Sequence, residues 1–492
     1  MSEKKTYIIE KIKSILIVVL FLTAVLLLYF FWADKDPFKM SLSDFSIGGG
    51  DSYERSLYAG NVLLPSRMEV VKDFGEMVVI EDSEKYYGNF SYVDTFLGSV
   101  RTFLTTGEIV LEEVPKEQYE EAYRFASVKC CFDYFLPAGE YLTYLGVEKL
   151  AGMENIQNIG EIGFVQGSPE SLLIRDADTG KCYRIVSENP STFVDRMLSD
   201  EEVQAMPNYY TIAEFMGEHV ESDVMIPLNL EADIAKTQVT AEISPEDSER
   251  ITGLARTFFG NSFDFVRKMG EVSGKITYMY GFAETVLIID NDGSLEYKSE
   301  NDASSSVGYF PSLDAALIFM DSHGFSQDEE KALKLKPFVS SAEPLSGGRK
   351  GYRFEFGMRS GGYSIFTEKP PVVVEVTGGV VSYYYRNVPV IGETAGKMQE
   401  AFSAINAIAV NYQSFQGYAV KNSLTREEGR PEPENSRQLT DEFSVDTVAG
   451  MIDSMKYGYL IREGEALPVW QVSLAGDDES LYFDLYTAEP VE

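Results

Sequence analysis

Two short aspartate-rich segments are the first candidates for chemistry in this 492-residue sequence. The segments that begin at Asp176 and Asp290 place carboxylates at alternate positions, as a calcium-binding loop does. Such a loop also needs a glycine at its sixth position, where these segments hold Lys181 and Leu295. Both segments are therefore predicted to be hairpin turns, since aspartate and glycine are the residues that such turns favour.

Histidine and cysteine are too few to form the common catalytic or metal sites. His219 and His323 have no partner at ligand spacing, so we expect each of them at the surface or at a helix end. Cys130 and Cys131 are adjacent and Cys182 is distant, which makes no C-x-x-C pattern. The three cysteines are either buried free thiols or, outside the cytoplasm, include a disulfide between Cys182 and one of the other two.

The remaining polar clusters also have simple structural explanations. The sequence holds no dinucleotide-binding, P-loop or zinc-protease motif. The acidic runs 200–202 and 427–434 are predicted to be solvated, because no acid or base partner accompanies them. Trp470 lies in an apolar strand-like run and is expected in a core. The sequence thus predicts no enzyme activity, no cofactor and no metal.

The net charge of the chain argues against one class of partner. It has 42 Lys and Arg against 78 Asp and Glu, a formal net charge of −36, which argues against nucleic-acid binding. Hydrophobic residues make up 44% and aromatic residues 13% of the chain, so large cores can form. The length is consistent with two to four domains of roughly 150 residues each.

The N-terminal region indicates a membrane anchor. Residues 14–33 carry no charge and are long enough to cross a bilayer as a helix, with Tyr29 and Trp32 at the far end. The alternative is a cleaved signal peptide, but no small-residue cleavage site follows. Four lysines precede the segment, so residues 1–13 are predicted to be cytoplasmic and the body extracellular, in a single-pass protein of the cell membrane.

A helix in lipid associates with other helices through small and hydrogen-bonding side chains. One face of the predicted anchor has this character and is our candidate partner contact, the alternative being plain exposure to lipid. It consists of Leu20, Thr23, Ala24 and Leu27.

The body is predicted to be α+β, with antiparallel sheets and packed helices, because its strand pairs are joined by short turns. Helices are expected at 91–104 and from Pro245, and strand pairs are expected within 171–187, 209–230 and 276–300. Near the C-terminus, helices at 312–325 and 444–460 are each followed by β-hairpins, which resembles a repeat. The predicted divisions are a tether at 34–53, an N-terminal ectodomain at 54–235, a middle domain at 236–305 and a C-terminal domain at 306–492.

Several segments together resemble the YycH family, the membrane-anchored extracellular regulators of an essential two-component sensor kinase in Firmicutes. The resemblance rests on the anchor and on segments spread along the chain. They are 61–71 (NVLLPSRMEVV), 258–282 (FFGNSFDFVRKMGEVSGKITYMYGF), 295–297, 352–366, 372–386 and 467–472, of which the last three resemble the C-terminal part of the sister protein YycI.

The resemblance implies a three-domain extracellular protein whose membrane helix pairs with YycI and with the sensor histidine kinase, without catalysis of its own. Two other functions remain open on the residues alone. The helix-plus-hairpin repeat also suits a PepSY-like module that binds peptides or inhibits a protease. A cell-wall enzyme is the remaining alternative, although no catalytic set supports it.

Overall fold

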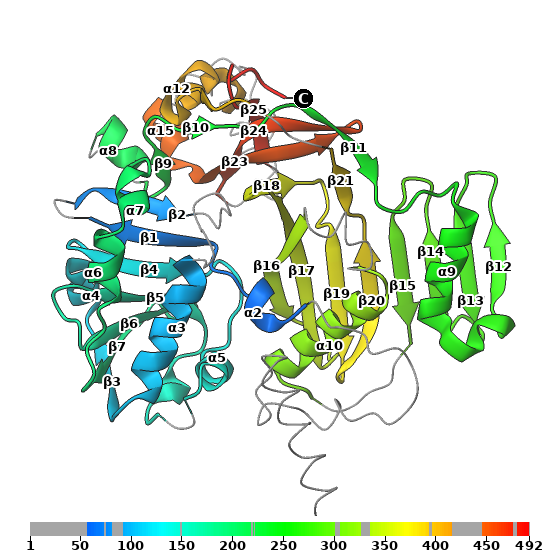
Figure 1. Ribbon diagram of the computed structural model, residues 1–492, viewed down its shortest axis with the longest axis horizontal. Coiled ribbons are helices and arrows are strands. Elements are labelled where there is room, and N and C mark those ends of the chain that lie inside the picture. Colours follow the sequence, from blue (N-terminus) through cyan, green and yellow to red (C-terminus); the bar gives the residue numbers. More distant parts are fainter. Residues whose placement is uncertain are drawn as a thin grey trace, which may run out of the picture. The chain divides into compact units, whose positions relative to one another are not determined.

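The computed structural model places all of its described residues in one compact unit, Arg55–Glu492 (Figure 1). It describes residues 57–72, 75–80, 92–147, 150–217, 220, 222–300, 306–325, 335–392, 396–415, 445–475 and 480–491. The predicted cytoplasmic tail, anchor and tether, with the contact face Leu20, Thr23, Ala24 and Leu27, lie outside these ranges, as does His219. Within them no helix is long and apolar enough to cross a membrane.

Nine of the described strands form a fully antiparallel first sheet, in the order β3-β7-β6-β5-β4-β1-β2-β8-β9 (Figure 1). Their bounds are β1 Arg67–Val71, β2 Met77–Ile80, β3 Ile109–Val114, β4 Ser127–Cys131, β5 Ile159–Val165, β6 Ser171–Asp176, β7 Cys182–Ser187, β8 Tyr209–Thr211 and β9 Met225–Pro227.

Helices cover both faces of this sheet because its strands are apolar on both sides. α3 (Tyr92–Thr105) places Phe96 and Phe103 edge-on against Phe164 of β5. The next residue, Val165, points to the opposite face and joins a small core with Tyr119 of α4 (Lys116–Ala122). The other helices of this part are α2 Ala59–Val62, α5 Ala138–Tyr144, η4 Met153–Asn155, α6 Phe193–Leu198, α7 Glu201–Ala205 and α8 Ile212–Met216.

Fourteen of the described strands form a second sheet, along the path β12-β13-β14-β15-β20-β19-β17-β18-β23-β24-β11-β21, with β16 paired to β17 and β25 to β24. Only the β18–β23 pair among these is parallel. The bounds are β11 Thr237–Ala241, β12 Arg267–Gly270, β13 Ile276–Tyr280, β14 Thr285–Ile289, β15 Leu295–Ser299, β16 Leu335–Pro344, β17 Gly351–Ser360, β18 Tyr363–Phe366, β19 Val372–Thr377, β20 Val380–Arg386, β21 Pro389–Ile391, β23 Ile452–Arg462, β24 Glu465–Leu474 and β25 Ser480–Asp484.

The helices of this second part are α9 Ser248–Phe259, η5 Gly260–Phe265, α10 Tyr309–Ser322, α12 Ala404–Val410 and α15 Val445–Gly450, and a separate pair joins β10 Glu231–Ala232 to β22 Gln399–Glu400. Helix α10 packs across β17, β19 and β20, where Phe319 meets the buried ring of Tyr384. His323 follows α10, which confirms the predicted helix-end position, and stacks on Phe319. Burial lowers the pKa of His323 to about 4, so its imidazole is neutral near pH 7.

A carboxylate from the first part caps the main helix of the second part. Glu140 of α5 accepts hydrogen bonds from the backbone N–H groups of Tyr309 (3.0 Å) and Phe310 (3.2 Å), at the first turn of α10. These N–H groups have no partner within the helix, and the positive end of the helix dipole favours the carboxylate. Gly308 permits this approach, because a Cβ there would lie 2.8 Å from the Glu140 oxygen.

Aromatic rings surround this cap and fill the joint between the two parts. Phe310 stacks on Tyr144 of α5 with ring centres 4.7 Å apart. Tyr309 contacts Phe135 from the first part, at 6.3 Å, and Phe354 of β17, at 5.4 Å. Aromatic pairs of this kind add about 0.5–1.5 kcal/mol beyond the area that they bury. We name this contact, made of Glu140 and these rings, the α5–α10 joint.

Many sequence predictions are confirmed. The turns near Asp178 and Asp292 join β6 to β7 and β14 to β15, the helices at 91–104 and near 245 are α3 and α9, and the α+β class with antiparallel sheets holds. Trp470 is buried, and its indole N–H donates to the carbonyl of Phe402 at 3.0 Å. All three cysteines are buried and free, which decides between the two alternatives.

Two predicted elements are wrong in part. The strand pair predicted within 209–230 forms as β8 and β9. However, residues 212–216, predicted to continue the first strand, form helix α8, because Thr211 and Glu214 make a reciprocal capping box that starts a helix there. The predicted helix at 444–460 ends at Gly450, and Ile452–Arg462 is the long strand β23, paired with β24 along its length. Strands β12–β15 and β16–β20 belong to one sheet. The predicted domain divisions stay a prediction.

We expect Glu140→Ala to loosen the α5–α10 joint, because two backbone N–H groups of α10 lose their acceptor. The expected cost is about 1 kcal/mol of unfolding free energy, with faster hydrogen exchange in peptides that contain Tyr309 and Phe310. Glu117→Ala is the matched control, since Glu117 is an exposed first-turn residue of α4. Unchanged exchange at the start of α10 in Glu140→Ala would show that the cap contributes nothing.

Candidate functional site

The largest cluster of titratable side chains in the described part crosses four strands of the first sheet. Glu69 of β1 lies between Arg67 (2.7 Å) and Lys129 of β4 (3.1 Å). Lys129 continues to Glu161 of β5 at 3.2 Å, and Glu161 meets Arg175 of β6 at 3.1 Å. Signs alternate along this row, which we name the charge ladder. Opposite charges on neighbouring strands stabilise a sheet.

Two further groups cover the ladder. The hydroxyl of Tyr119 donates to Glu161 at 2.9 Å, and the Lys129 ammonium lies 5.3 Å from the ring centre of Tyr123. The thiol of Cys131 lies 3.6 Å from a carboxylate oxygen of Glu69. Every charge of the ladder therefore has an opposite charge or a hydrogen-bond partner, as buried polar groups require.

The pKa shifts within the ladder indicate a structural role. Burial raises the pKa of Cys131, and the Glu69 carboxylate raises it further, so the group is a thiol and a poor nucleophile near neutral pH. Burial alone would raise the pKa of Glu69, but Lys129 and Arg67 lower it overall. Burial also disfavours the charged form of Lys129, yet Glu69, Cys131 and Glu161 raise its pKa. Each ionised group is stabilised in place.

The carboxylates of the two aspartate-rich turns accept hydrogen bonds from nearby backbone N–H groups. The Asp176 side chain is fully buried and accepts hydrogen bonds from the backbone N–H groups of Gln157, Asp178 and Thr179. Asp292 likewise accepts from the N–H of Ser294 at 2.8 Å. In the residues that the structure describes, no group of three or more His, Cys, Asp or Glu side chains is arranged to hold a metal ion.

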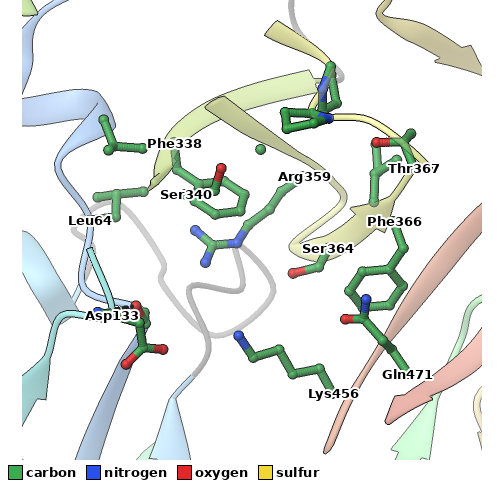
Figure 2. Close-up of a pocket in the computed structure, with 16 residues that line it drawn as sticks. Leu64, Asp133, Phe338, Ser340, Arg359, Ser364, Phe366, Thr367, Lys456 and Gln471 are labelled. Carbon is green, nitrogen blue, oxygen red and sulfur yellow. Dashed lines mark hydrogen bonds between the residues drawn. The ribbon is translucent and has the colours of Figure 1, made fainter. Parts of the chain in front are cut away.

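A cavity of about 280 Å³ lies where loops next to β1 and β4 approach the second sheet. Figure 2 shows the Arg359 and Lys456 side chains pointing into this space, with Asp133 on another wall. Arg359 comes from β17, Lys456 from β23, and Asp133 from the loop after β4. The lining residues are Leu64, Ser66, Asp133, Phe338, Val339, Ser340, Gly357, Arg359, Ser364, Ile365, Phe366, Thr367, Pro370, Pro371, Lys456 and Gln471.

Two glycines shape the wall that carries the basic groups. Gly357 leaves space for the ring of Phe338 from β16, because a Cβ at 357 would lie 2.5 Å from that ring. The Arg359 guanidinium then rests 4.0 Å from the centre of the same ring. Gly458 lets β18 approach β23, since a Cβ there would lie 2.2 Å from the carbonyl oxygen of Ser364. The wall thus depends on close backbone contacts.

A second candidate surface lies at the β12 end of the second sheet (Figure 1). Phe265, Val272 and Phe282 are 80%, 110% and 101% exposed. β12 pairs only with β13 among the described strands, so its outer edge is open there. The strand itself is exposed and begins with Arg267 and Lys268. An open edge flanked by exposed large apolar residues is typical of an interaction surface. We name it the β12 edge.

The two antiparallel sheets and their packed helices define an α+β protein whose largest described charge cluster is structural. Among solved structures, the chain is similar to YycH from Bacillus subtilis, with a TM-score of 0.55 and 10% sequence identity, over 86% of this chain and 96% of that chain. At this identity the likeness concerns the fold alone. The predicted resemblance to YycH is confirmed at that level, and the chain has a YycH-like fold.

Two further solved structures overlap smaller parts of the chain. An uncharacterized protein from Eubacterium rectale has a TM-score of 0.34 and 12% identity over 60% of this chain and 97% of its own. The C-terminal domain of YpeB from Bacillus megaterium has a TM-score of 0.24 and 13% identity over 50% of this chain and 96% of its own. Scores this low carry no argument about function. No family model and no curated protein matches the sequence.

The sequence predictions gave no site role to the residues of the cavity or of the ladder, although several of them lie in the segments that carry the YycH resemblance. Asp133, Arg359 and Lys456 lie far apart in the chain and carry no motif, so only the fold brings them together. One local signal was present for the cavity: β17 contains Arg353, Glu355 and Arg359 at alternate positions, which places charges along one face of a strand. The predicted membrane contact residues are outside the described ranges and stay a prediction.

We expect Lys129→Met to cost about 3 kcal/mol of unfolding free energy near pH 7, because it leaves the buried Glu69 and the half-buried Glu161 without their shared cation. Lys181→Met is the control, since Lys181 and Glu113 form an exposed pair 3.1 Å apart. Such a pair contributes at most about 1 kcal/mol. Urea unfolding of both variants measures the difference, and equal losses would contradict the structural role of the ladder.

The same variant has a defined pH dependence. The folded pKa of Glu69 is lowered, so the stability that it contributes is present above the ordinary value of 4.5 and is lost as pH falls through the folded pKa. Below its folded pKa the Glu69 carboxylate is protonated, and Lys129 then has less charge to neutralise. The difference between wild type and Lys129→Met should therefore shrink as pH falls below 4.5.

Proposed function

We propose that this protein is a non-catalytic, membrane-anchored regulator of a sensor histidine kinase. The observation that carries the proposal is the YycH-like fold, which extends over 86% of the chain. The resemblance of the sequence to the YycH family points to a regulator, and the largest titratable cluster of the described part is a satisfied structural ladder. We further propose a YycI-like sister protein as a second partner.

The predicted anchor supports a mechanism that acts within the membrane. A signal from the body would reach the kinase through packing of the membrane helices. Small and hydroxyl-bearing side chains allow close packing in lipid, which is why we propose the face with Thr23 and Ala24 as the contact.

We propose the β12 edge as the second contact, made with the ectodomain of the partner. The register pairs Arg267 with Met279, which brings Phe265 to the end of the hairpin where Phe282 also lies. Arg267 and Lys268 make this strand basic, although the chain as a whole carries −36. A complementary partner is an acidic, extended segment that adds to the open edge and covers the apolar side chains.

We expect Ala24→Leu to reduce co-purification of the full chain with the sensor kinase from detergent-solubilised membranes. The larger side chain separates helices that pack through Ala24. Val25→Leu is the control, since Val25 lies on another face of the predicted helix. Equal recovery of the kinase with both variants contradicts the proposed helix contact. If wild-type protein recovers no kinase, and deletion of the gene leaves kinase output unchanged, the regulatory function itself is wrong.

We expect Phe282→Ser, alone and with Phe265→Ser, to weaken association with the partner while leaving the thermal midpoint of the protein unchanged. Both rings are exposed, so their loss affects contacts with other molecules more than the core. Phe125→Ser is the control, because Phe125 is 63% exposed and lies in the first part, before β4. A loss of association in Phe125→Ser of the same size as in Phe282→Ser would contradict the β12 edge as the contact.

A further inference from the structure

β12 is the terminal strand of the second sheet, and its outer edge offers backbone groups to a further strand (Figure 1). The N–H of Glu271 donates to the carbonyl of Lys275 at 2.9 Å, so these two residues form a hydrogen-bonded pair of the β12–β13 hairpin. Hydrogen-bonded positions alternate along an antiparallel pair, so every second residue from Glu271 back to Arg267 bonds toward β13. Lys268 and Gly270 therefore direct their N–H and C=O groups outward, where none of the described strands pairs with them.

The side chains of β12 point alternately to its two faces. The Lys268 ammonium lies 5.4 Å from the ring centre of the buried Tyr278, so Lys268 belongs to the packed face of this part of the sheet. Arg267, Met269 and Glu271 belong to the opposite face, and all three are exposed. That face of the edge therefore carries a cation at one end and a carboxylate at the other.

These two charges cannot neutralise each other within one copy of the chain. Four residues of a strand extend roughly 13 Å, so Arg267 and Glu271 are too far apart for an ion pair. No ion pair joins either of them to another residue that the structure describes, and Glu271 accepts a hydrogen bond from the hydroxyl of Ser273 at 3.3 Å. An antiparallel strand from a second copy can supply an opposite charge to each of them.

Three antiparallel arrangements bring the outward groups of two β12 strands together, and charge favours one of them. With the two-fold axis at Lys268, two ammonium groups lie opposite each other, which is unfavourable. With the axis at Gly270, Arg267 and Glu271 of the two copies are out of register. With the axis at Met269, Arg267 of each copy lies directly opposite Glu271 of the other. In this register the strand is complementary to itself.

Exposed apolar residues lie at both ends of the strand. Phe265 precedes β12 and is 80% exposed, and Val272 follows it and is 110% exposed. An antiparallel second copy brings the Val272 turn of one chain to the Phe265 end of the other. Each copy can thus cover an apolar side chain that a free edge leaves in water.

We propose that β12 of one copy pairs with β12 of a second copy, antiparallel and with the two-fold axis at Met269, so that Arg267 and Glu271 form two ion pairs between the copies. The paired stretch is short, which indicates a weak and reversible dimer. The same edge is the contact proposed above for the ectodomain of the partner, so a copy held in the dimer is not available to that partner. Self-pairing requires no kinase, and this proposal therefore goes beyond the proposed function.

The first test is disulfide formation in the full chain, purified in detergent and carrying Met269→Cys. In the proposed register this position lies opposite itself at a non-hydrogen-bonded pair, where Cα atoms are about 4.5 Å apart and a disulfide fits. Mild oxidation should therefore convert most of the Met269→Cys protein into a covalent dimer. The native cysteines do not interfere, because all three are buried and free.

Two further cysteine variants are the matched controls. Lys268→Cys lies on the same strand but faces Gly270 of the other copy, so it should crosslink roughly tenfold less than Met269→Cys. Phe125→Cys, at an exposed position of the first part, measures crosslinking by random collision.

The second test reverses the charges. Arg267→Glu and Glu271→Arg should each weaken the dimer roughly tenfold or more in analytical ultracentrifugation, because each variant places like charges opposite one another. An equal mixture of the two variants should regain the association of the wild type, since a dimer of one variant with the other has opposite charges at both ends. Both positions are exposed, so the thermal midpoints should stay unchanged.

Two results would overturn the dimer. They are crosslinking of Met269→Cys no greater than that of Phe125→Cys, and a mixture of the charge variants that associates no more than either variant alone. Lys268→Cys that crosslinks as readily as Met269→Cys would overturn the register. All of these measurements use the protein without a kinase, so they can fail while the proposed regulatory function holds, and the reverse is equally possible.

Discussion

The α5–α10 joint connects the first part of the chain to the helix that packs across the second sheet. Glu140 reaches from the first part to the start of α10, and α10 in turn packs across β17, β19 and β20. A carboxylate at a helix N-terminus accepts hydrogen bonds from unpaired backbone N–H groups and also interacts favourably with the helix dipole. The contact is therefore both directional and stabilising. The surrounding rings add packing to this polar contact. The cavity is also lined from both parts of the chain.

The charge ladder shows how this chain accommodates charge within a sheet. Each ion of the ladder lies beside an opposite ion on the same strand or on the next one, so the row is complete. Buried pairs that satisfy one another contribute specificity of structure.

The sequence could predict local structure where short-range chemistry decides it. Aspartate, asparagine and glycine favour the two hairpin turns, and apolar spacing favours helix α3. These signals act over a few residues, so they are sufficient to predict the turns and the helix. The capping box at Thr211 is also a local signal, but the strand-like residues next to it led to the prediction of a strand. Strand β23 depends on its pairing with β24, and that long-range pairing overrode the helical spacing of 444–460. The cavity and the α5–α10 joint could not be predicted, because their residues are distant in the sequence and only the tertiary fold brings them together.

Basic groups that lie close together are a notable feature in a chain with such a negative net charge. At physiological ionic strength a charge is screened over about 8 Å, so most of the −36 acts on an approaching molecule only when it is close. Arg267 and Lys268 stand on an exposed edge, where a pair of cations favours an acidic partner at the moment of encounter. In a body this acidic, attraction of an acidic partner is restricted to places where cations gather, and the β12 edge is such a place.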